Sequence, residues 1–166
     1  MTSWNALHAA APDLAERARD IILCTTNAVL ATLHRDGSPR LSGIDPFFFE
    51  EEFWFGSMPS ARKGDDLRRD PRMAIHSIPW ESRQVKAEDP GDVDAKVNGR
   101  AISLTDPAEV ARMMAWFKHE RGLEPPDGAD LFRVDLRAVV TIEVEGDHLV
   151  IDQWTASAGR QTIKRT

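Results

Sequence analysis

One segment, residues 53–67 with the sequence FWFGSMPSARKGDDL, constrains the fold and function of this chain most strongly. Its aromatic start is typical of a buried strand, and the polar run after it predicts the first turn of a helix. A helix N-terminus offers unpaired N–H groups and a positive dipole end, which suit a phosphate. Arg62 and Lys63 would add a forked donor and a compact charge to the same anion. Two readings stay open here: a phosphate site, or a solvated surface helix that Ser60 caps.

Composition excludes several classes of protein. The length of 166 residues fits one domain with a single core. A net charge of −6 argues against non-specific binding to nucleic acid or to a membrane surface. The single cysteine, Cys24, excludes an internal disulfide, and its apolar neighbours favour packing over a reactive thiol. The five histidines lack metal-ligand spacing, so we expect no metal site. The chain shows neither an apolar run of ~20 residues nor a signal-peptide pattern, so we expect a cytoplasmic protein.

Hydrophobic patterning predicts a β-rich domain with helices at its joints. Helices are expected at residues 11–25, 60–69 and 107–120. Strands are expected at residues 29–33, 40–49, 53–56, 73–78, 93–104, 131–144 and 148–154. This order suits a closed or nearly closed antiparallel barrel better than a parallel sheet with crossover helices. The polar segment 79–92 is either a lid or a surface excursion.

Several short motifs follow one another in a fixed order, and the order is more specific than any one of them. They are ATL at 31–33, DGSPR at 36–40, FWF at 53–55, RKG-x-x-L at 62–67 and DPRMA at 70–74. In this order and spacing the chain resembles the pyridoxamine 5'-phosphate oxidase-like superfamily, most strongly over residues 29–78.

The resemblance implies a mainly β fold with flanking helices: an FMN-binding split β-barrel, an antiparallel Greek-key barrel. It implies one domain over residues 1–166, with an N-terminal helix at about 11–25 and the barrel at about 28–155. It also implies a homodimer with the flavin across the subunit interface, and a small-molecule substrate.

The resemblance further implies a set of cofactor-binding residues. They are Arg40, Ser42, Gly43, Ile44, Gly56, Ser57, Arg62, Lys63, Asp94, Trp154 and Lys164. Gly43 would let the backbone approach a flat ring, or it marks a bulge. Asp94 stands where the family has a glutamine. Trp154 either contacts the cofactor or packs as an aromatic side chain at the end of a strand.

The C-terminal residues indicate which branch of the family this chain is not. Trp154 and Arg160 keep the spacing of the true vitamin B6 oxidases, whereas Thr162 replaces a histidine and Lys164 an arginine of that branch. The tyrosine that the family uses for the substrate phosphate has no counterpart, because the chain contains no Tyr. We therefore do not expect oxidation of vitamin B6. Arg160 and His76 remain candidates for contact with another substrate.

Three functions stay open. The first is an FMN-dependent oxidoreductase that transfers a hydride to or from an unidentified small molecule. In that case the cofactor supplies the chemistry, which agrees with the lack of a nucleophile–base set in the sequence. The second is a reductase that uses the deazaflavin coenzyme F-420, whose anionic tail needs a basic channel; Arg68, Arg69 and Arg72 form either that channel or a solvated face. The third is a flavin- or haem-binding protein without turnover, with His76 as the candidate axial ligand.

Overall fold

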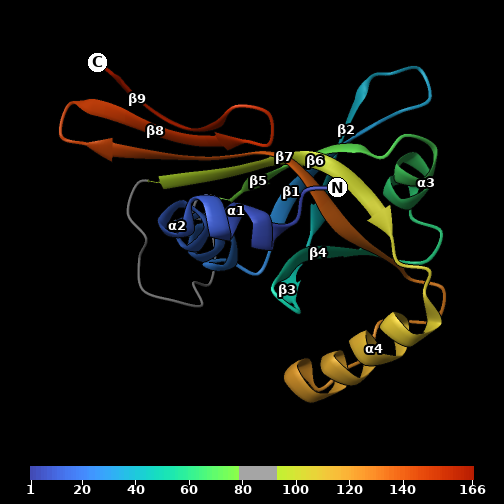
Figure 1. Cartoon of the computed structure of the whole chain (residues 1–166). Coiled ribbons are helices and arrows are strands. Elements are labelled where there is room, and N and C mark those ends of the chain that lie inside the picture. Colours follow the sequence, from blue (N-terminus) through green and yellow to red (C-terminus); the bar gives the residue numbers. More distant parts are fainter. Residues whose placement is uncertain (79–92) are drawn as a thin grey trace.

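The computed structural model describes residues 1–78 and 93–166, which hold nine strands and four helices (Figure 1). The helices are α1 (Trp4–Ala10), α2 (Pro12–Leu23), α3 (Arg62–Arg69) and α4 (Pro107–Arg121). The strands are β1 (Ala28–Leu33), β2 (Pro39–Ile44), β3 (Pro46–Phe49), β4 (Glu52–Ser57), β5 (Arg72–Ser77), β6 (Val93–Ser103), β7 (Asp130–Glu145), β8 (His148–Thr155) and β9 (Gly159–Arg165). The expected lid or excursion at 79–92 lies outside the described residues.

The strands form one antiparallel sheet in the order β2-β1-β5-β6-β7-β4-β3, which confirms the expected mainly antiparallel β architecture. β2 and β3 are the two ends of this path, yet Asp45 alone separates them in the sequence. Pro46 has no N–H to donate to a ladder, and the residue before a proline prefers an extended backbone. The chain therefore passes from one end of the curled sheet to the other at this point, and a split without ladder pairing separates the two ends.

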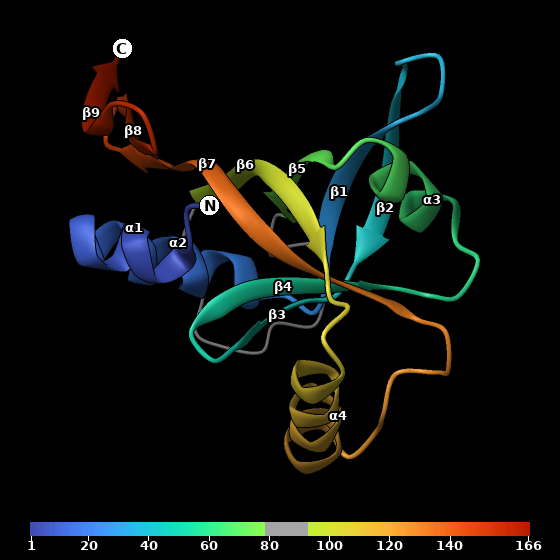
Figure 2. The same ribbon diagram turned by 45° about the vertical axis from the view of Figure 1, so that its right-hand side comes forward.

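β7 is long enough to pair with different strands at its two ends. Its first residues pair with β4, and its last residues pair with β8, which in turn pairs with β9. The pairing of β6 with β7 shifts its register between Asn98 and Gly99. A side chain at Gly99 would overlap the Asp135 carbonyl oxygen, so only glycine fits this bulge. Figures 1 and 2 show the β8–β9 hairpin and α4 at opposite ends of the molecule.

The core has two parts because β3 is covered on both faces. Phe48 points into the barrel, where its ring lies 5.1 Å from that of Phe53. Phe47 and Phe49 point the other way and pack under α4, with Trp116 5.4 Å from the Phe47 ring. All four residues of β3 are therefore buried, and its sequence is continuously apolar instead of alternating.

The structure corrects several predicted boundaries at the N-terminal side. The helix predicted at 11–25 is α2, Pro12–Leu23, and a separate helix, α1, precedes it. Ser3 caps α1 through the Ala6 N–H, but seven residues are too few to show an amphipathic period. Cys24 is buried after the end of α2 and donates to the Ile21 carbonyl oxygen over 3.0 Å.

Other corrections concern strands and one helix cap. The strand predicted at 40–49 is broken into β2 and β3 at Asp45, before Pro46. β9 was not predicted because its polar side chains present no buried face. The helix predicted from Ser60 begins at Arg62, so Ser60 does not cap it: the N-cap is Ala61, and Ser60 has a left-handed backbone with φ 59°. No helix of the described residues has the length and apolar character needed to cross a membrane.

Candidate functional site

A pocket of about 300 Å³ lies at the split between the two ends of the sheet. One wall comes from the ends of β2 and β4, with Gly43, Ile44, Gly56 and Ser57. Lys63 of α3 lies on the same side. The opposite wall comes from α4 and the segment after it, with apolar side chains and one guanidinium. The volume is at the lower end of that of ligand pockets.

The β2 wall is open to a flat ligand at Gly43. A Cβ placed there would meet no protein atom within 4 Å, so the backbone of this strand is bare toward the pocket. The register between β1 and β2 runs without a shift, with Gly43 opposite Val29. The glycine is therefore not a bulge. Gly56, on the β4 side, has ordinary contacts with Leu131.

The first turn of α3 faces this wall without a side-chain cap. Its N-cap, Ala61, is extended and offers no side-chain acceptor. The Gly64 N–H donates to the Ala61 carbonyl oxygen over 2.9 Å, whereas the N–H groups of Arg62 and Lys63 have no acceptor among the described residues. The Lys63 ammonium donates to the Gly43 carbonyl oxygen over 2.8 Å. Burial lowers the pKa of Lys63. The buried Ser57 hydroxyl lies beside Gly64 of the same turn and donates to the Met58 carbonyl oxygen over a long 3.4 Å.

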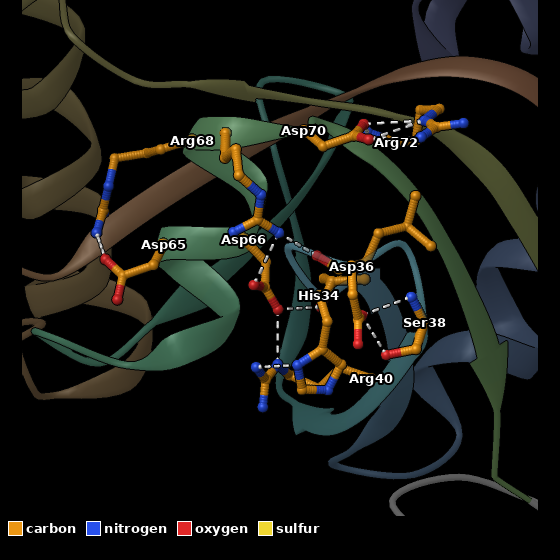
Figure 3. A network of polar contacts seen from close by, with 12 residues as sticks. His34, Asp36, Ser38, Arg40, Asp65, Asp66, Arg68, Asp70 and Arg72 are labelled. Carbon is orange, nitrogen blue, oxygen red and sulfur yellow. Dashed lines mark hydrogen bonds and ion pairs between the residues drawn. The ribbon is translucent and has the colours of Figure 1, made fainter.

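The cations of α3 fall into two groups, one paired with carboxylates and one not, and Figure 3 shows Arg68 of the paired group beside Asp65. Arg68 donates to Asp65 over 2.5 Å and also contacts Asp130. Arg69 pairs with Asp66 over 3.0 Å. Arg62 and Lys63, in the first turn, form no ion pair with a carboxylate among the described residues.

Arg40, a predicted cofactor-binding residue, forms an ion pair with another residue of the chain, Asp66. Its Nε donates to Asp66 over 2.6 Å, and its Nη2 lies 2.9 Å from His34 Nδ1 (Figure 3). Asp66 is buried and also accepts from Thr32 over 3.1 Å. Burial would raise the pKa of Asp66, but the donors from Arg40, Arg69 and Thr32 outweigh it and hold the pKa below its usual value. The contact ties β2 to α3.

The remaining predicted residues lie outside the pocket in this chain. Ser42 is half-buried on β2 and alternates with Gly43, and Arg62 is exposed beside Lys63. On β5 and β6, His76 Nε2 lies 3.8 Å from Asp94 Oδ2.

The C-terminal candidates lie on the β8–β9 hairpin, away from α4 (Figure 2). Trp154 is buried in the main core, as the packing interpretation expected. Arg160 pairs with Asp13 over 2.7 Å and with Asp152 over 2.6 Å, and these contacts raise its pKa. Lys164 pairs with Glu145. Within one chain these side chains do not reach the pocket.

The sequence analysis missed the opposite wall of the pocket. Phe117 and Arg121 of α4 line it, together with Pro125 and Pro126. The Arg121 guanidinium lies 5.4 Å from the Phe47 ring and donates to Asp45 over 2.5 Å. These residues are far from the phosphate motif in the sequence, and no local pattern indicates that they meet it. The described residues contain no cluster of three or more His, Cys, Asp or Glu placed to hold a metal.

Comparison with known proteins shows the family. The family described as "Pyridoxamine 5'-phosphate oxidase" matches residues 14–145. The chain belongs to the pyridoxamine 5'-phosphate oxidase-like family. The search of curated proteins found no match to this chain.

Solved structures confirm the split-barrel fold expected of the family. The haem-binding protein of Mycobacterium smegmatis has a TM-score of 0.65 at 21% identity, covering 89% of this chain and 60% of that one. Campylobacter jejuni ChuZ has a TM-score of 0.68 at 13% identity, covering 89% of this chain and 61% of that one. PhzG of Burkholderia lata 383, in complex with tetrahydrophenazine-1-carboxylic acid, has a TM-score of 0.64 at 13% identity. The match covers 92% of this chain and 88% of that one. The chain thus spans only about three fifths of the first two proteins.

Proposed function

We propose that the pocket binds FMN and that the protein is a flavin-dependent oxidoreductase acting on a small molecule. The observation that supports this most is the unequal pairing of cations on α3. In a chain with 27 acidic and 21 basic residues, Arg62 and Lys63 remain without a carboxylate partner among the described residues. Both stand in the uncapped first turn of a helix, where a phosphate is favoured by the backbone N–H groups and by the dipole.

The residues present fit this cofactor. Lys63 and the Ser57 hydroxyl, which line the pocket, would hold the phosphate together with Arg62, which is exposed beside Lys63. The bare backbone at Gly43 would lie along the flavin ring, because nothing within 4 Å of that position obstructs a flat group. When bound, a flavin supplies the ability to accept or donate a hydride. The chain itself then binds and orients the cofactor and keeps water from one face of the ring.

A deazaflavin coenzyme is less well supported by the charges around α3. Arg68, Arg69 and Arg72 were the candidates for its anionic tail, and each is paired with an aspartate of the same segment. A ligand would have to displace those carboxylates. Arg72 and Asp70 form such a pair over 2.6 Å (Figure 3).

Haem binding has support only from similarity of fold, since two structural neighbours, the haem-binding protein of Mycobacterium smegmatis and the haem storage protein HutZ of Vibrio cholerae, are 21% and 20% identical to this chain. The described lining of the pocket contains no His or Cys, and His76, the candidate axial ligand, lies outside it. Met58 lines the pocket and is the residue there that a haem iron would accept.

We also propose that a second copy of the chain completes the site. Leu41 and Gly43 share one face of β2, and the Leu41 side chain is 71% exposed. Met58, which lines the pocket, is 61% exposed. A homodimer would cover these side chains and close the open side of the pocket.

The test is to load the purified protein separately with FMN, deazaflavin coenzyme and haem, and to follow each by absorption spectroscopy. Tight binding of FMN alone, followed by reduction and reoxidation of the bound flavin, is the expected result. Tight binding of haem or of deazaflavin with no binding of FMN would contradict the proposal. Light scattering with and without FMN tests the homodimer.

A further inference from the structure

The two walls of the pocket carry charge in different ways. The charged residues that line it are Lys63 on the β2 side, Arg121 on the α4 side, and Asp45, which follows the end of β2 and reaches Arg121. Lys63 has a backbone carbonyl as its partner and is available to a phosphate. Arg121 and Asp45 are paired with each other over 2.5 Å, so the wall away from the phosphate motif is close to neutral.

Arg121 is fixed in its position from several sides. Its guanidinium carbon lies 5.4 Å from the Phe47 ring and 5.7 Å from the rings of Trp116 and Phe117. Such contacts hold the planar group in place on aromatic faces. Its side chain is 26% exposed, which leaves it few solvent contacts. A guanidinium fixed on the wall of a pocket would be a strong receptor for a carboxylate or phosphate.

Asp45 removes that possibility. Its side chain is 48% exposed, and ion pairs of this kind contribute little to stability, so the fold does not depend on it. A ligand anion that approached Arg121 would lie beside the Asp45 carboxylate and would meet like-charge repulsion. The remaining wall, from Phe117, Pro125 and Pro126, offers apolar contacts.

We propose that Asp45 is a specificity-determining residue that makes the pocket select uncharged, flat apolar substrates and reject anionic ones. The inference rests on the proposed function, since it assumes that the β2 side of the pocket holds the cofactor. Discrimination is then achieved partly by repulsion of the wrong ligand. Replacement of Asp45 by asparagine uncovers the charge of Arg121 and turns the same wall into an anion site.

The test uses two isosteric probes, 2-naphthamide and 2-naphthoate, titrated into the FMN-loaded protein by calorimetry. The wild type is expected to bind the amide at least about tenfold more tightly. Asp45→Asn is expected to shift the ratio of the two affinities toward the naphthoate by about tenfold, the effect of one charge-assisted hydrogen bond. Asp45→Asn combined with Arg121→Gln is expected to lose that gain.

Glu50→Gln is the matched control. Glu50, in the turn between β3 and β4, pairs with Arg112 of α4, so this variant removes an ion pair of the same helix without uncovering a guanidinium in the pocket. It is expected to leave the ratio unchanged. A wild type that prefers the naphthoate, binds neither probe, or keeps its ratio after Asp45→Asn overturns the inference. Failure of the proposed function shows separately, as a lack of FMN binding when the wild type is loaded.

Discussion

The Lys63 ammonium donates to the Gly43 carbonyl oxygen over 2.8 Å and so joins the first turn of α3 to the bare backbone of β2. The two positions are the ones where a flavin nucleotide would need the protein most: a cation for the phosphate and an unobstructed strand for the ring. They lie on the same side of the pocket and are 20 residues apart in the sequence. The hydrogen bond thus joins the two halves of the proposed cofactor site.

The first prediction concerns the bare strand. Gly43→Val is expected to leave the free energy of unfolding unchanged or slightly raised, because a Cβ at this position has open space around it and valine suits a strand. The same side chain would fill the space proposed for the ring, so FMN affinity is expected to fall by at least about tenfold. Urea unfolding of the variant measures its stability, and titration with FMN measures its affinity for the cofactor. Undiminished FMN affinity would place the ring elsewhere.

A second prediction concerns the pH dependence of cofactor binding. Burial lowers the pKa of Lys63 from its usual value of 10.5, and a phosphate bound beside it would raise that pKa again. FMN affinity is therefore expected to fall as the pH rises through the lowered pKa of the free protein. Lys63→Arg is expected to flatten this dependence, since a guanidinium stays charged. Riboflavin, which has no phosphate, is the control ligand, and an equally steep fall for it would contradict the assignment.

The third prediction concerns the buried carboxylate that ties β2 to α3. Asp66→Asn is expected to lower the free energy of unfolding by about 2 kcal/mol, because Arg40 and Arg69 lose a charged partner. The folded-state pKa of Asp66 lies below its usual value of 3.8, so its contribution is present above that pH and is lost as the pH falls through the folded-state pKa. The stability of the wild type should thus fall more steeply than that of the variant below about pH 4.

Asp70→Asn is the comparison for this effect. The side-chain hydrogen bond from Arg72 lowers the pKa of Asp70 to about 2, but the pair is exposed, and exposed pairs contribute little. Its loss is expected to change stability less than the loss of Asp66. Urea titrations of both variants from pH 3 to 7 measure the difference. A greater loss in Asp70→Asn would show that the buried network is not what fixes α3.

These contacts show which parts of the site the sequence could predict. Lys63 belongs to a strand–turn–helix pattern that local signals predict, whereas Gly43, Gly56 and Ser57 were named from the family resemblance. All four line the pocket. Arg40 lies in the same region, but its partner Asp66 is 26 residues away on another element, and no periodicity links the two.

The residues of the opposite wall could be identified only from the folded structure. Arg121 and Asp45 are 76 residues apart, and they meet only because α4 packs on the outer face of β3. Likewise, the cap at Asp106 and Pro107 predicted the helix at 107–120 with Val110, Met113, Met114 and Phe117 buried. Met113 and Phe117 are buried, whereas Val110 and Met114 are half-buried. The sequence did not indicate that Phe117 also lines a pocket. Tertiary packing decides both points.

A fourth prediction separates this chain from the vitamin B6 oxidases. The wild type is expected to show no turnover of pyridoxamine 5'-phosphate, because Thr162 stands in place of a histidine and the chain has no Tyr. Thr162→His is expected not to restore the activity. In the structure Thr162 lies on β9 and contacts Asp152, on the hairpin away from α4. Measurable oxidation by the FMN-loaded wild type would refute the exclusion.

The most direct test of the account is a set of four calorimetric titrations: wild type and the Arg62→Ala, Lys63→Ala double variant, each with FMN and with riboflavin. Two charge-assisted contacts are worth about 1.5–3 kcal/mol each, so the variant is expected to lose FMN affinity by at least about a hundredfold. Its affinity for riboflavin and its unfolding midpoint are expected to match those of the wild type. Equal FMN affinity in the two proteins, or no preference of the wild type for FMN over riboflavin, would contradict the phosphate site.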